Sequence, residues 1–193
     1  VLTATLDDAT LLHVLIDEDR VSPDEWTQPA SLVLTGESAR EYRIGKPQTD
    51  ATEACKRAAE HYACRHYSTR AEELTRRYMR LLHGVEVRSV DLHGTGQSDW
   101  AEGYLVLDNL AETHGDDYIL SEGEGQVILK SCAVEWQAYW AGEVYGFIHT
   151  TADGEELDSC WGFYLNEGHG PVEFAKSGAY GHVNGNVTKL EWA

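Results

Sequence analysis

The sequence predicts an α+β fold, in which an antiparallel sheet with a C-terminal β-hairpin packs against three to four helices. Two apolar, aromatic-rich runs, residues 143–149 and 157–164, flank an Asp-Gly pair, as in a hairpin. In the segment 125–140, apolar residues mostly recur three or four apart, as on one side of a helix. Short apolar runs and helix-start patterns earlier in the chain indicate the remaining strands and helices.

The first 48 residues predict strands separated by loops. Residues 11–16 form a strand-length apolar run that an acidic group ends. Residues 31–36 predict a second strand, and residues 41–44 a third, which Gly45 and Pro47 close. Because the alternation of apolar and polar residues is imperfect, these three strands rest mainly on composition and length.

Two helices are expected next. Asp50 is a capping residue with Glu53 three positions on, which predicts a helix that runs to about Tyr67. A similar pattern predicts a second helix over residues 70–82, which Gly84 ends. A single long helix with a break near residue 68 is the alternative.

The remaining chain predicts alternating strands and helices around the hairpin. A loop rich in glycine covers residues 93–100, and residues 111–118 form an acidic short helix or loop. Proline opens a candidate helix over residues 171–180. The other expected elements are strands over residues 85–90, 104–107 and 187–192 and the helix over 125–140.

Charge divides the sequence into three regions. Residues 1–48, an N-terminal strand and loop region, carry nine acidic and four basic residues. Residues 49–84, a basic helical segment, carry five and seven, and residues 85–193 carry nineteen and four. We expect the last region to be an acidic α+β core that contains the hairpin 143–164, and one compact domain is the alternative. The basic helices are expected to form a solvated face, or to pair with the acidic body of the same or a second subunit.

The net charge of −18 is the most informative bulk property. Solubility of a small domain needs a charge magnitude of only about 2–8. A strongly negative potential disfavours nucleic acid and acidic membranes and attracts basic protein surfaces. We therefore expect a host protein with a basic surface as partner, with no direct nucleic-acid or membrane binding, and we leave a homodimer open.

The four cysteines and the start of the chain indicate a reduced compartment. A chain of 193 residues with 42% hydrophobic residues can build a core without disulfides. The early acidic pair, Asp7 and Asp8, is unlike a signal peptide, and no apolar run approaches about 18 residues. We expect a soluble protein of the host-cell cytoplasm.

The hairpin register follows if Asp153 and Gly154 are the two central residues of a tight turn. His149 then lies opposite Asp158, and Gly146 opposite a large aromatic ring. One face, which carries Val144, Ile148, Leu157, Trp161 and Phe163, is expected to be core. The other face, which carries Tyr145, Phe147, Cys160 and Tyr164, is too apolar for solvent and needs a cover, either the preceding helix or a partner.

The pattern GEVYGF at residues 142–147, followed by DSCWGFY at residues 158–164, resembles a box in uncharacterised small proteins of bacteriophages and mobile elements of actinobacterial and other Gram-positive hosts. The resemblance covers about residues 127–175. It implies a phage or plasmid setting and a role in dealing with a host cell, and it brings no established activity.

The cysteines are candidates for two kinds of chemistry. Cys160, His149 and Asp158 would share one hairpin face, with the thiol diagonal to the histidine, as a cysteine-dependent hydrolase or transferase would need. Cys55, His61, Cys64 and His66 resemble metal ligands in sequence. Helical spacing separates them onto different sides, however, so no metal and no cofactor are expected.

The acidic residues before the hairpin are the predicted partner-binding surface. Carboxylates spread over a surface can imitate a nucleic-acid backbone, which carries one charge per about 1.7 Å of duplex. The leading prediction is a non-enzymatic accessory protein that binds a host protein, with mimicry of nucleic acid as one form and the cysteine enzyme as the alternative. The predicted binding residues are Asp99, Glu102, Asp108, Glu112, Asp116, Asp117, Glu122 and Glu124.

Overall fold

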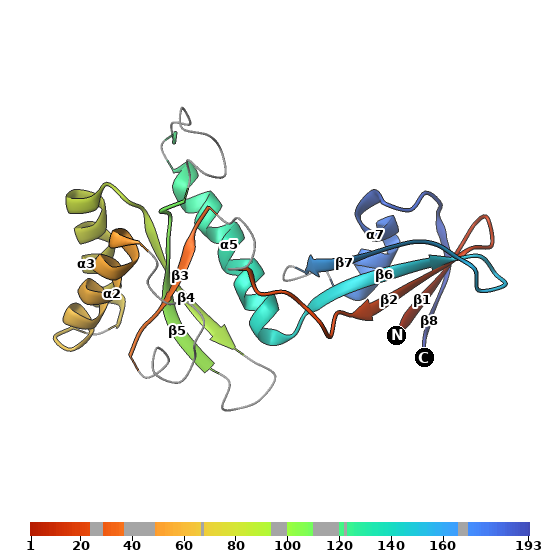
Figure 1. Ribbon diagram of the computed structural model, residues 1–193, viewed down its shortest axis with the longest axis horizontal. Coiled ribbons are helices and arrows are strands. Elements are labelled where there is room, and N and C mark those ends of the chain that lie inside the picture. The colour runs from red at the N-terminus through yellow and green to blue at the C-terminus, as the bar shows by residue number, and fades with distance from the viewer. Residues whose placement is uncertain are drawn as a thin grey trace. The chain divides into compact units, whose positions relative to one another are not determined.

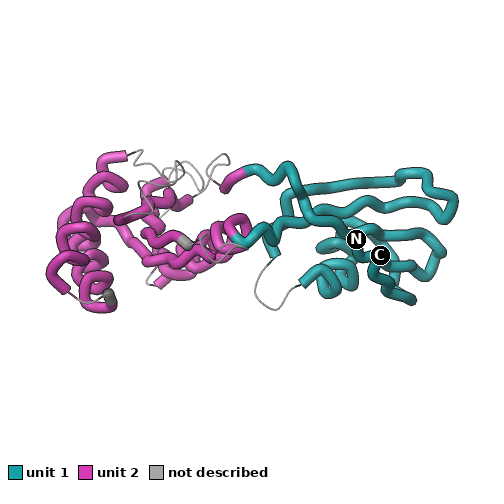
Figure 2. The backbone as a smooth tube through the Cα atoms, turned by 90° about the horizontal axis from the view of Figure 1, so that it is seen from below, with its two compact units in different colours: residues 1–21, 141–193 teal, residues 22–140 magenta. Residues whose placement is uncertain are grey.

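The computed structural model confirms the α+β class, with helices packed on two antiparallel sheets. The chain forms two compact units, residues 1–21 with 141–193 and residues 22–140, which we call unit 1 and unit 2 (Figure 2). The predicted divisions at residues 48 and 84 follow charge, whereas the contacts divide the chain at residues 21 and 140. The residues described are 1–23, 29–36, 49–66, 68–93, 100–109, 120–121, 123–165 and 170–193.

Unit 1 is built on a five-stranded antiparallel sheet with the strand order β7-β6-β2-β1-β8. In β1, Leu2, Ala4 and Leu6 are buried and alternate with partly exposed threonines, so only one face of this sheet is apolar. The strands are β1 (Leu2–Leu6), β2 (Leu11–Ile16), β6 (Val144–Thr150), β7 (Glu156–Tyr164) and β8 (Val187–Trp192).

Two short segments cover the apolar face of this sheet. Helix α6 (Pro171–Lys176) begins with proline at its first turn, as expected. The following turn α7 (Gly178–Gly181) is left-handed, because all four of its residues have positive φ. The core between sheet and helices includes Phe147 and Phe174, both fully buried.

Unit 2 is a three-layer arrangement around the sheet β3-β5-β4 (Figure 1). One face carries the helices α2 and α3, and the other carries α5. In β3, Val33 packs toward α2 while Leu32 and Leu34 pack toward α5. The elements are β3 (Ser31–Leu34), α2 (Asp50–Ala63), α3 (Ser68–His83), β4 (Val87–His93), β5 (Trp100–Val106) and α5 (Glu124–Ala141).

The two-helix prediction for residues 50–82 is confirmed, but the predicted cap is wrong. Thr49 caps α2: its hydroxyl accepts from the Thr52 backbone N–H at 3.1 Å, and the Thr52 hydroxyl accepts from the Thr49 N–H at 2.8 Å. This reciprocal pair replaces the predicted one between Asp50 and Glu53. The helix also ends earlier than expected, at Ala63.

Most predicted strands form within a few residues of their expected bounds, and β1 is a strand that the sequence did not predict. The helix predicted over 171–180 is wrong in its second half, where the chain turns left-handed. The strand predicted over 41–44, most of the glycine-rich loop and the acidic segment 111–118 lie outside the described residues.

The hairpin register is confirmed in its middle, where His149 pairs with Asp158 and Phe147 with Cys160. The predicted two-residue turn is wrong. The Thr151 N–H donates to the Glu155 carbonyl, and the Gly154 N–H donates to the Thr151 carbonyl, so the loop has three residues. Register shifts on both sides of the paired middle compensate for this change.

The predicted core face of the hairpin is only partly right: Val144 is buried and Phe163 packs against the core as expected, but other residues differ. Phe147 is fully buried in the core of unit 1, with Tyr145 and Cys160 packed against that core. By contrast, Leu157 is 51% exposed and Trp161 is 44% exposed. The expected cover of the Phe147 face exists, but α6 and α7 provide it rather than the helix that precedes the hairpin.

Candidate functional site

His149, the base in the cysteine-enzyme alternative, is held by Thr10 rather than by Asp158. Its Nε2 lies 2.8 Å from the Thr10 hydroxyl, which donates to the Asp8 carboxylate at 2.6 Å. The two hydrogen bonds from Thr10 are the main cause that lowers the pKa of Asp8, so this carboxylate is an acceptor. With the Thr10 hydroxyl directed to Asp8, its oxygen can accept from Nε2 of His149, so Nε2 is engaged by Thr10.

The other two members of the cysteine-enzyme alternative also have other neighbours. The Asp158 carboxylate accepts from the backbone N–H of Ser159 at 2.9 Å. The Cys160 thiol lies 4.0 Å from the Trp161 carbonyl, and its side chain packs against the core of unit 1. The register brings the three residues to one part of the hairpin without forming a chain of nucleophile, base and orienting acid.

The sulfur and imidazole groups of α2 do not converge. Burial raises the pKa of Cys55 to about 12, so this thiol stays protonated at neutral pH. Cys64 is exposed and donates to the His61 carbonyl at 3.1 Å. Within the described ranges, no three His, Cys, Asp or Glu side chains gather closely enough to hold a metal ion.

Three of the eight predicted partner-binding acids are described, and two of them have local structural roles in unit 2. Asp108 accepts from the Ser31 backbone N–H and from the Thr49 hydroxyl at 2.6 Å, which ties β3 and the start of α2 to the end of β5. Glu124 accepts from the backbone and side chain of Ser121 at the start of α5. The other five, Asp99, Glu112, Asp116, Asp117 and Glu122, lie outside the described residues.

Glu102 is the third, and it lies directly opposite Asp91 across β4 and β5. Like charges in directly opposed positions destabilise a sheet. Burial, and then the charge of Asp91, raise the pKa of Glu102. Each of the three described acids thus has its own local environment in unit 2.

The basic helix α3 has a mixed surface. Arg70 pairs with Glu73, and Arg80 pairs with Glu86 at 2.6 Å, as expected of a solvated helix face. A shallow hollow of about 450 Å³ lies along this helix. Its lining includes Arg76, Arg77 and the exposed Leu81.

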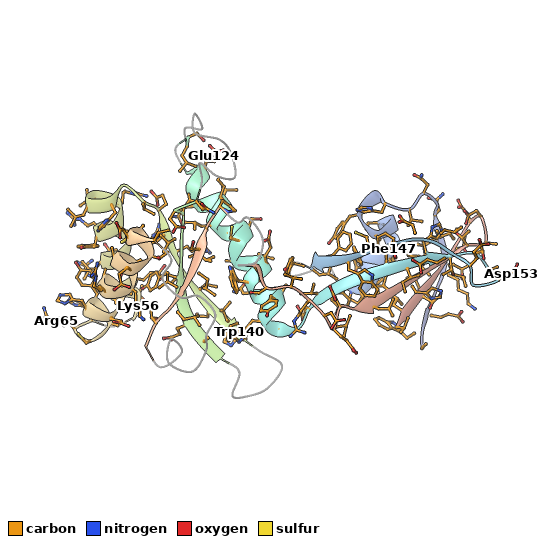
Figure 3. The ribbon with its side chains drawn as sticks, viewed as in Figure 1. Lys56, Arg65, Glu124, Trp140, Phe147 and Asp153 are labelled. Atoms are coloured by element: carbon orange, nitrogen blue, oxygen red, sulfur yellow. The ribbon has the colours of Figure 1, made fainter. Side chains whose placement is uncertain are left out.

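The β6–β7 hairpin of unit 1 carries a cluster of acidic residues. From residue 131 to residue 175 the sequence contains no lysine or arginine. Glu155, Glu156 and Asp158 lie exposed along the turn and β7, next to Asp153 at the tip (Figure 3). None of the ion pairs among the described residues involves these acids.

Trp161 is fixed on the hairpin by a glycine. A Cβ atom at Gly146 would lie 2.1 Å from the Trp161 ring, so the indole lies directly on the bare backbone of β6. Gly162, with φ of +86°, allows the local irregularity in β7 beside it. The predicted cover of a glycine by this ring is thus confirmed, while the ring itself remains partly exposed.

A cluster of aromatic rings lies on the other side of β7. Phe163 packs against Phe174 with ring centroids 4.9 Å apart, and against Tyr180 and His182 at 5.9 and 5.6 Å. The left-handed turn α7 brings Tyr180 and His182 to Phe163, although Ala179 and Tyr180 adopt costly positive φ values. The sequence signal for this turn is the pair of glycines, Gly178 and Gly181, that bracket it.

Comparison of the chain with protein-family models, with curated proteins and with solved structures finds no match in any of the three. Among the described residues, no helix is long and apolar enough to cross a membrane. The candidate site therefore rests on the chain's own geometry: an acidic hairpin with an exposed indole on one side and an aromatic cluster on the other.

Proposed function

We propose that this protein is a non-enzymatic binding protein whose partner is a protein with a basic surface. The observation that carries the proposal is the acidic hairpin of unit 1, where a run of 45 residues has no lysine or arginine to neutralise its carboxylates. Such a field attracts cationic surfaces and raises their association rate. The net charge of −18 over the whole chain adds to this attraction.

The narrower form of the proposal is an accessory protein of a phage or mobile element that acts on a host protein. The resemblance of the segments 142–147 and 158–164 to small phage proteins supports this setting. A host protein that handles nucleic acid has the basic groove that an acidic surface can occupy. In this form the protein inhibits its target by mimicking nucleic acid in the cytoplasm of the host.

The experiment is capture of a partner from host lysate, followed by titration of the purified pair. We expect the affinity to fall at least tenfold between about 50 and 200 mM salt, because each contact between charges is screened. An affinity that does not change over this range contradicts the proposal. Duplex DNA added as competitor tests mimicry separately, because a mimic and DNA cannot occupy one groove together.

A further inference from the structure

Strand β7 is an open edge of the unit 1 sheet. Among the described residues it pairs with β6 on one side only, and it is nine residues long. From Glu156 to Trp161 every residue is exposed except Cys160, which is partly buried. A strand with free backbone N–H and C=O groups is a template for an additional strand.

The side chains on this edge could anchor such an added strand. Trp161 lies on the face away from α6, and Ser159, which faces Ile148, lies two residues before it on the same side. Asp158, which lies opposite His149 in the register, is directed toward the opposite face. An extended segment beside β7 would therefore place alternate side chains near the indole and near this carboxylate.

Charge determines which segment fits. Two β7 strands side by side would bring Glu156 and Asp158 of one copy close to the same acids of the other, so a second copy is repelled. A segment rich in lysine or arginine is attracted by the same acids. On the other face of the segment, an alternate side chain contacts the exposed ring of Trp161, and a lysine or arginine at that position adds a cation–π interaction.

The opposite edge of the sheet, β8, also has an exposed tryptophan, Trp192, and an exposed acid, Glu191, but it differs from β7 in charge. Strand β8 carries Lys189 in its middle, and the Lys189 ammonium lies 2.7 Å from the Glu191 carboxylate. A lysine on an edge strand opposes a cationic segment and is a common protection against strand addition. The two edges of one sheet thus differ in the partner that they can accept.

We propose that β7 binds an extended, lysine- or arginine-rich segment of the partner by strand addition, with Trp161 as its aromatic anchor. This inference rests on the proposed function and specifies its contact. The backbone of the partner segment pairs with residues 156–161, its cations lie near Glu156 and Asp158, and the side chains that alternate with them lie near Trp161.

The test uses fluorescence anisotropy with a labelled peptide of about eight residues that alternates Lys with Val or Thr. A second peptide has the same sequence, but the backbone nitrogens that would donate to β7 are methylated. It therefore keeps the charge and loses these backbone hydrogen bonds. Glu156→Lys on β7 is compared with Glu191→Lys on β8, the same change on the other edge. Circular dichroism verifies that both variants keep the fold.

We expect the N-methylated peptide to bind about tenfold more weakly than the parent peptide, because strand addition depends on backbone pairing. Glu156→Lys should weaken binding about fivefold and Trp161→Ala about tenfold, while Glu191→Lys changes it less than about twofold. Equal affinity of the parent and N-methylated peptides overturns binding by strand addition. Equal effects of Glu156→Lys and Glu191→Lys overturn β7 as the binding edge.

Either of these two negative outcomes would be compatible with the proposed function, because an acidic surface can attract a basic partner without pairing of a strand with β7. The proposed function fails separately, if the affinity of the captured partner does not respond to salt. If the parent peptide does not bind at low salt, the edge inference is overturned whatever the captured partner shows.

Discussion

The two units use their sheets differently. In unit 2, helices cover both faces of a three-stranded sheet, with α2 and α3 on one side and α5 on the other. In unit 1, α6 and α7 cover one face of a five-stranded sheet, and no described element of this unit packs on the other face. Unit 2 therefore covers its sheet on both faces, whereas unit 1 covers only one face of its sheet with its own elements.

The sequences of the strands reflect whether one or both faces of their sheet are covered. In β3, Leu32, Val33 and Leu34 are consecutive apolar residues, because both sides of the strand are covered. In β1, apolar residues alternate with threonine, because only one side is covered. Continuous and alternating runs thus distinguish a sheet that is fully buried from one that can present a surface.

The largest expected effect compares the covered and bare faces of the unit 1 sheet. Phe147→Ala should lower the free energy of unfolding by about 3–5 kcal/mol, because Phe147 is fully buried and its loss leaves a cavity. Trp161→Ala, on the bare face, should cost less than about 2 kcal/mol, because the indole already contacts solvent. Urea denaturation of each variant measures both values.

Hydrogen exchange with peptide resolution then tests whether the units depend on each other. In Phe147→Ala, peptides from residues 144–164 should lose protection, while those from α2 and α3 keep it, since unit 2 has its own cores. Equal loss of protection in both units would show that the two unfold together. The two sheets would then not be independent in stability.

The next effect concerns two glycines with similar φ, one in each unit. Gly178 has φ of +61°, and a Cβ there would lie 2.2 Å from the Val183 carbonyl oxygen. Gly84 has φ of +66° and nothing within 4 Å of such an atom. Gly178→Ala should therefore cost about 2–4 kcal/mol, and Gly84→Ala about 1 kcal/mol. Equal thermal shifts in the two variants would contradict the structure of the left-handed turn.

Two hairpin loops within unit 1 provide a reciprocal test. The loop 7–9 has the same backbone hydrogen bonds as the loop 152–154, with Ala9 at φ of +67° where the second loop has Gly154 at +89°. Ala9→Gly should stabilise the protein by about 0.5 kcal/mol, and Gly154→Ala should destabilise it by about 1 kcal/mol. Chemical denaturation checks both signs, and a destabilising Ala9→Gly would refute the shared loop geometry.

Local patterns in the sequence were enough to predict the fold class and most elements. The helix over 125–140 and the last strand follow from periodicity and composition, and the structure places them within two residues. The burial of the two hairpin faces could not be predicted, because it depends on the position of α6 and α7. Those segments follow β7 in sequence, yet they cover the Phe147 face rather than the Trp161 face.

The candidate site was harder to predict than the fold. Spacing correctly placed His149 opposite Asp158, but it could not reveal Thr10, which lies far away in sequence and holds the imidazole. Nor could charge counts distinguish Asp108, whose carboxylate accepts from Ser31 and Thr49 far away in sequence, from Glu156, which lies on an open edge. Strand order determines which acids are available, and strand order comes from long-range pairing.

The smallest expected effect tests whether opposed acids in unit 2 cost stability. Because burial and Asp91 raise the pKa of Glu102 above 4.5 in the folded protein, the folded state binds its proton more tightly than the unfolded state. The free energy of unfolding should therefore fall as pH rises from about 4 through this raised pKa. In Glu102→Gln, which has no carboxylate at this position, this fall should be absent. At pH 7 the variant should be more stable by less than about 1 kcal/mol, because solvent screens this exposed pair. The difference should vanish below about pH 4, where both forms are neutral. Urea denaturation across this range measures it, and a Glu102→Gln advantage that persisted at low pH would show that the gain is not electrostatic.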